Sequence, residues 1–189
     1  MALIDEILAT NEHFCANLPE EYKAYEHEDP HDSKIPKKHL AILTCVDARL
    51  VSYLEPALGL KRGDAKIIKT VGNCVTGYFD TAVKSLLVTI YELEVREIAV
   101  IGHHHCGMQA TTSESLTKAM LSRGISPDAI KMVEKELKDW ADGFRDPEQN
   151  VRDVVKLLRE DPLIPKDVKI HGLLFHPRSG QLTLVDKGE

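Results

Sequence analysis

The chain has 189 residues, of which 43% are hydrophobic, and its formal net charge is −6. This length and composition allow a sizeable core, and we expect one domain spanning residues 1–189. The acidic balance, without a basic stripe interleaved with aromatic residues, argues against nucleic-acid binding.

Neither a membrane span nor an export signal is expected. No apolar segment is long enough to cross a bilayer, and the acidic start of the chain lacks the basic and apolar regions of a signal peptide. The four cysteines do not resemble a secreted disulfide framework, which favours metal ligands or buried thiols. We therefore expect a cytoplasmic protein.

The first 38 residues are expected to form an N-terminal helix and an arm. Residues 3–18 place Ile4, Ile7, Leu8 and Cys15 on one face at helical spacing, which predicts that Cys15 is buried. Residues 19–38 are polar and charged, with two prolines, as in an arm.

The remaining chain alternates strands and helices. Apolar runs predict strands at 39–45, 65–70, 97–102, 169–175 and 181–185. Helices are predicted from the capping-box pattern at Ser52 to Gly59, over 75–93, and after Ser126-Pro127 and Asp146-Pro147. The order predicts an α/β fold, in which helices flank a mostly parallel sheet of about four strands plus an antiparallel C-terminal strand.

Two motifs directly follow the first and third predicted strands. Cys45-x-Asp47-x-Arg49 ends the first strand, and His103-x-x-Cys106 follows the third. Ligands of open α/β sheets bind at the carboxyl ends of strands, where the strand order reverses. If these two strands are neighbours, the two motifs meet.

Thiolate and imidazole are the ligands that zinc prefers, so we expect Cys45, His103 and Cys106 to bind one Zn²⁺. Three protein ligands leave a fourth position open, as in catalytic sites. Asp47, held by Arg49, is expected either to accept a hydrogen bond from zinc-bound water or to ligate the metal itself. Two thiolates donate more charge than imidazoles would, which predicts activity that rises at alkaline pH.

Together the motifs resemble the β-class carbonic anhydrases of the shorter bacterial and archaeal type. Further similarity extends over most of the chain beyond about residue 37, at Gly63–Lys66, Gly72-Asn73, Asp161–Pro165 and His171-Gly172. The resemblance implies a zinc lyase that hydrates carbon dioxide reversibly to bicarbonate by a metal-bound hydroxide. It assigns zinc binding to Cys45, His103 and Cys106 and the catalytic dyad to Asp47 and Arg49. It also implies a homodimer or higher homo-oligomer, with residues 1–38 packing on a partner subunit.

Two other functions remain open on the sequence. The same fold and ligands also serve hydrolases of carbon disulfide and carbonyl sulfide. A non-catalytic zinc module, with Asp47 as a permanent fourth ligand, is the second alternative. His104 and His105 are interpreted as residues of the pocket rim or of the solvated surface.

Overall fold

The computed structural model describes residues 2–23 and 34–188 and divides the chain into two compact units, Met1–Ile35 and Pro36–Glu189. The first unit contains helices α1 (Leu3–Ala16) and α2 (Glu20–Lys23). No residue of α1 is buried, so the prediction that Cys15 is buried was wrong. The packing of this segment on a partner subunit stays a prediction.

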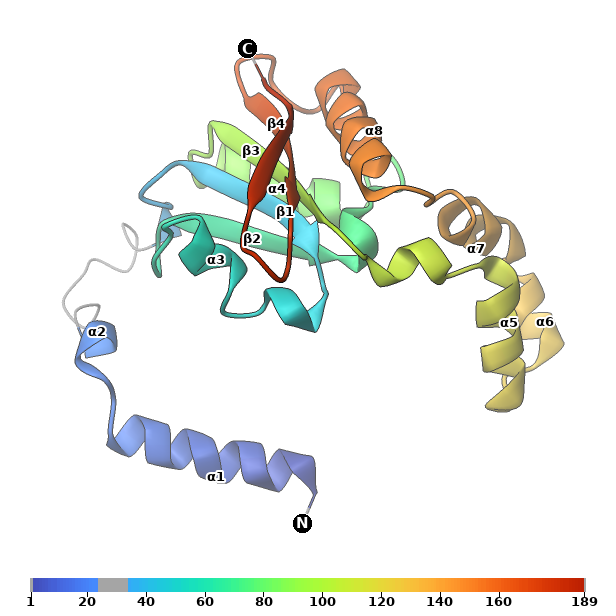
Figure 1. Ribbon diagram of the computed structural model, residues 1–189, viewed down its shortest axis with the longest axis horizontal. Helices are drawn as coiled ribbons and strands as arrows, with labels where there is room; N and C mark the ends of the chain where they lie inside the picture. The colour runs from blue at the N-terminus through green and yellow to red at the C-terminus, as the bar shows by residue number, and fades with distance from the viewer. Residues whose placement is uncertain (1, 24–33, 189) are drawn as a thin grey trace. The chain divides into compact units, whose positions relative to one another are not determined.

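The second unit is built on a five-stranded sheet with the order β2-β1-β3-β4-β5 (Figure 1). Strands β1 to β4 are parallel, and β5 pairs antiparallel with β4. This arrangement confirms the predicted fold class. The strands are β1 (Leu40–Cys45), β2 (Ala65–Thr70), β3 (Glu97–His103), β4 (Lys169–Phe175) and β5 (Leu182–Asp186).

Two apolar clusters cover the two faces of this sheet. Ala41 and Leu43 of β1 belong to one cluster and Ile42 to the other, because successive side chains of a strand point to opposite faces. The first cluster is completed by α4 (Thr81–Tyr91) and α8 (Pro147–Glu160). The second receives Leu54 of the short helix α3 (Leu54–Ala57) and Phe144.

The predicted helix boundaries needed correction at two places. Asp80 caps α4 by accepting a hydrogen bond from the amide of Val83 at 2.9 Å, so this helix begins at Thr81 and not near residue 75. Ser52 does not cap α3, since Tyr53 occupies the N-cap position and makes no side-chain cap bond. Ser52 instead has a left-handed backbone, with φ 54°.

Between β3 and α8 the chain forms three helices, where the sequence indicated one. They are α5 (Ser113–Ser122), α6 (Pro127–Lys131) and α7 (Glu134–Ala141). The N-cap of α6 is Ser126, as predicted. Among the described residues, none of the helices has the length and apolar character needed to cross a bilayer.

Candidate metal centre

The two sequence motifs meet because β1 and β3 are hydrogen-bonded neighbours. Thr44 and Ile101 are register partners, so Cys45 and His103 lie at the same carboxyl edge of the sheet. The chain then turns through His105, with φ 55°, and brings Cys106 back to this edge. The strand order reverses between β1 and β3, which is where the fold predicts a ligand site.

Three candidate ligand atoms converge there in a buried position. The sulfurs of Cys45 and Cys106 and an imidazole nitrogen of His103 all lie within 4.8 Å of one another. The three residues are 4%, 5% and 1% exposed, respectively. They form the one such metal-ligating group found in the part of the chain that the structure describes.

The imidazole of His103 is held in one tautomer. Its Nδ1 lies 3.0 Å from the carbonyl oxygen of His104, and a carbonyl only accepts, so Nδ1 carries the proton and donates it. The lone pair of Nε2 is therefore free. Nε2 is buried, and no group of the described residues hydrogen-bonds to it. A buried imidazole nitrogen without a partner costs free energy unless a ligand such as a metal satisfies it.

The spacing of the sulfurs fits a tetrahedral zinc ion. With Zn–S bonds of about 2.3 Å, two tetrahedral thiolate ligands are about 3.8 Å apart. The two sulfurs lie 4.0 Å apart in the structure. Together with the free Nε2, this distance shows that the residues present fit the metal.

The pKa values of the two thiols at the centre are shifted in opposite directions. The hydrogen bond from Cys106 lowers the pKa of the Cys45 thiol far below its ordinary value, against the opposing effect of burial, and backbone amides of Asp47 and Gly72 lower it further. The same hydrogen bond, together with burial, raises the pKa of Cys106. These contacts favour the thiolate of Cys45, the form that binds zinc.

Asp47 lies beside this centre and is held by Arg49. The guanidinium donates from Nε to Asp47 Oδ1 at 2.9 Å and from Nη2 to Oδ2 at 2.6 Å. These hydrogen bonds lower the pKa of Asp47 to about 2. Oδ2 lies 3.7 Å from Nε2 of His103, so an ionised carboxylate faces the space between the ligand atoms.

Arg49 also connects the two motifs. Its Nη2 donates to the carbonyl oxygen of His105 at 2.8 Å, so a single guanidinium orients Asp47 and holds the turn between His103 and Cys106. The sequence indicated the Asp47–Arg49 pair but not this bond, because no spacing rule connects Arg49 with a carbonyl 56 residues away.

His104 and His105 follow His103 directly in the chain and reach the surface, and their interpretation as residues of the pocket rim or of the solvated surface stays a prediction. His104 is partly exposed and His105 is exposed. Their rings lie near the ring of His176, with centroid distances of 5.3 Å from His104 and 6.3 Å from His105. The sequence offered no signal that His176 belongs to this group.

One contact of the centre was missed entirely in the sequence. The backbone amide of Gly72 donates to the sulfur of Cys45 at 3.3 Å. Gly72 follows β2, and the pair Gly72-Asn73 indicated only a similarity to a family motif. The role of a backbone amide has no signature in side-chain types.

Comparisons with known proteins agree with this geometry. The model of the carbonic anhydrase family matches residues 40–182. A putative carbonic anhydrase of Bacillus subtilis, YvdA, is 37% identical over 191 residues, which cover 100% of this chain and 93% of that protein. The crystal structure of β-carbonic anhydrase isoform I from Trichomonas vaginalis superposes with a TM-score of 0.92 and 40% identity, over 100% of both chains. A carbon disulfide hydrolase of an Acidianus species is 31% identical, over 77% of this chain and 76% of that protein.

Proposed function

Because this chain belongs to the β-carbonic anhydrase family, we propose that it is a zinc lyase that hydrates carbon dioxide reversibly to bicarbonate. The observation that carries this proposal is the buried convergence of two sulfurs and an unpartnered imidazole nitrogen within 4.8 Å. Cys45, His103 and Cys106 are the residues that would hold the zinc ion.

The metal and the dyad have separate tasks. When bound, zinc supplies a Lewis acid that lowers the pKa of a coordinated water to about 7 in favourable sites, so that hydroxide is available near neutral pH. Asp47 is ionised throughout this range and only accepts hydrogen bonds, so it would accept one from the O–H of the attacking oxygen and orient it.

Arg49 keeps Asp47 in that role. Its two hydrogen bonds fix the carboxylate and offer it a partner other than the metal. In a resting form of the enzyme, Asp47 would itself bind zinc as the fourth ligand. Its Oδ2 lies only 3.7 Å from Nε2 of His103, which is close enough for both atoms to reach one ion.

Stopped-flow measurement of carbon dioxide hydration, together with zinc analysis, tests the function. We expect stoichiometric zinc and a rate that rises from about pH 7 to about pH 9, because the two thiolates make the bound water less acidic. Zinc-loaded protein without hydration activity over this range would contradict the proposal.

The second candidate activity is hydrolysis of carbon disulfide or carbonyl sulfide. It is favoured by the 31% identity with the carbon disulfide hydrolase of Acidianus. Comparison of turnover on the three substrates, with one zinc-loaded preparation, separates the two activities. Faster turnover of either sulfur compound than of carbon dioxide would replace the leading proposal.

A homodimer or larger homo-oligomer in the cytoplasm completes the proposal. A crystal structure of two β-carbonic anhydrases from Sordaria macrospora describes those proteins as tetrameric. In this chain α1 exposes Leu3, Ile4, Ile7 and Leu8, the apolar side chains that a partner subunit would cover. Light scattering during gel filtration measures the oligomer, and cell fractionation tests the location.

A further inference from the structure

The sulfur of Cys45 accepts a hydrogen bond whose donor, Gly72, lies in a tight turn. Residues Val71–Asn73 form a single 3₁₀ turn after β2, and Gly72 and Asn73 both have left-handed backbones, with φ 65° and 50°. Glycine adopts this conformation without a steric penalty and asparagine tolerates it, so residue type alone does not fix the turn. The direction of the Gly72 amide therefore depends on what holds this turn.

Gly72 itself has no room to adapt. A Cβ at this position would lie 3.0 Å from Met108 Cγ and 3.1 Å from Phe144 Cε2. These contacts close the turn from one side without fixing the peptide direction, because neither side chain offers a hydrogen bond.

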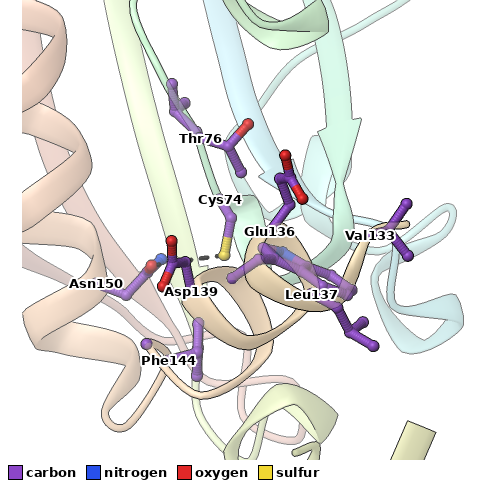
Figure 2. Close-up of a pocket in the computed structure, with 11 residues that line it drawn as sticks. Cys74, Thr76, Val133, Glu136, Leu137, Asp139, Phe144 and Asn150 are labelled. Carbon is purple, nitrogen blue, oxygen red and sulfur yellow. Dashed lines mark hydrogen bonds between the residues drawn. The ribbon is translucent and has the colours of Figure 1, made fainter. Parts of the chain in front are cut away.

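The N–H of Gly72 belongs to the Val71–Gly72 peptide, whose carbonyl oxygen accepts from the Cys74 amide at 3.3 Å. The following peptide, which carries the Gly72 carbonyl, is held by Asn150 from the first turn of α8. Its Nδ2 donates to the carbonyl oxygen of Gly72 at 3.0 Å. Its Oδ1 accepts from the thiol of Cys74 at 3.6 Å, a contact that Figure 2 shows at the wall of a pocket of about 670 Å³. The two contacts leave the Asn150 amide one orientation, with its nitrogen toward Gly72.

Cys74 is suited to this task because it keeps its proton. Burial raises the pKa of the Cys74 thiol to about 11, so at neutral pH it is a donor and not an acceptor. Its own backbone is tied to β2, since Thr70 Oγ1 donates to the Cys74 carbonyl oxygen at 2.9 Å. The Cys74 thiol thus lies within reach of both Asn150 Oδ1 and, at 3.7 Å, the Gly72 carbonyl oxygen. Asn150 and Cys74 together hold Gly72, whose amide bonds to the sulfur of Cys45.

We propose that Asn150 is a positioning residue: by holding Gly72, it sets the geometry of the N–H···S bond to Cys45. Through that bond it tunes the metal affinity of the Cys45 thiolate and the charge that the thiolate donates. The inference rests on the proposed zinc site. A hydrogen bond to a ligating sulfur orients it and withdraws charge from it. Loss of the orientation weakens metal binding, typically 10–100-fold for outer partners of metal ligands, while loss of the charge withdrawal raises the donor energy of the sulfur.

The test is Asn150→Leu, which keeps the branching at Cγ but is larger and lacks both hydrogen bonds. Gln149→Leu is the matched control, because Gln149 lies next in sequence on α8 and bonds to Asp153 instead. Zinc affinity is measured by competition with a chromophoric chelator, and the thiolate-to-cobalt charge-transfer band is recorded on the Co²⁺-substituted protein. We expect roughly tenfold weaker zinc binding and a band at longer wavelength for Asn150→Leu, and wild-type values for Gln149→Leu.

An unchanged band and affinity in folded Asn150→Leu overturns the inference. If that variant does not fold, Cys74→Val removes the thiol that faces both Asn150 Oδ1 and the Gly72 carbonyl oxygen. We expect the same direction of change, with wild-type values in Cys74→Ser. An unchanged band in Cys74→Val then overturns it. Neither readout requires turnover, so wild-type protein that binds both metals without hydrating carbon dioxide refutes the proposed function and leaves this inference to its own test.

Discussion

Helix α8, which carries Asn150, packs on the sheet through Val151, and this packing depends on a glycine of β4. A Cβ at Gly172 would lie 2.7 Å from Val151 Cγ1 and 3.2 Å from Val155 Cγ2. Cβ atoms do not tolerate the shorter distance, so Gly172→Ala must displace α8 or force Val151 out of its rotamer. Overpacking of this kind costs roughly 1–3 kcal/mol.

A double-mutant cycle isolates this contact. Val151 is fully buried, so Val151→Ala removes two methyl groups at about 0.8 kcal/mol each and leaves a small cavity, in total roughly 2 kcal/mol. In the double variant the new Cβ no longer meets Val151 Cγ1, which made the shortest contact, and it fills part of that cavity; the 3.2 Å contact with Val155 Cγ2 remains. We therefore expect the double variant to be more stable than the sum of the single changes by about 1–2 kcal/mol.

Urea unfolding of the metal-free protein in EDTA measures these differences, with unchanged slopes as the condition for comparing midpoints. Gly77→Ala is the control, because a Cβ there meets nothing within 4 Å. It should be neutral or stabilise by up to about 1 kcal/mol. Additive effects of Gly172→Ala and Val151→Ala, or a Gly172→Ala variant as stable as wild type, would refute the reasoning.

Three further changes concern the metal centre directly. Cys106→Ser should lose both zinc and turnover, since it removes a buried candidate ligand, whereas Cys15→Ser at an exposed cysteine should keep both. Zinc retained in Cys106→Ser would exclude Cys106 as a ligand. Asp47→Asn should lower hydration activity at least tenfold and keep most of the zinc, as measured by stopped flow and metal analysis, and full activity would remove Asp47 from the mechanism. Arg49 holds the pKa of Asp47 at about 2, below the ~3.9 of an aspartate in the unfolded chain. The ion pair therefore stabilises the fold fully above about pH 5, and its contribution falls progressively as the pH approaches 2. The difference in urea midpoint between wild type and Asp47→Asn should therefore shrink from about pH 5 to about pH 3, and a constant difference would contradict this assignment.

The sequence determined the strands and the identity of the candidate ligands. Each parallel strand is a short apolar run, and residue type alone marks Cys45, His103 and Cys106 as zinc-type donors. The alternation of strands and helices predicted the parallel sheet, because parallel neighbours need a crossover between them. Capping patterns in the sequence were less reliable where tertiary packing sets the backbone conformation. Ser52 begins a capping-box pattern, yet it has a left-handed backbone and does not cap a helix.

Only the tertiary structure decided how the ligands are oriented. The tautomer of His103 depends on the carbonyl of His104, and the amide that reaches Cys45 comes from Gly72, whose carbonyl is held by Asn150, 78 residues further along the chain. These are hydrogen bonds of backbone groups, which every residue carries, so no pattern of side chains announces them. Their partners are fixed only when β1, β2, β3 and α8 have packed together.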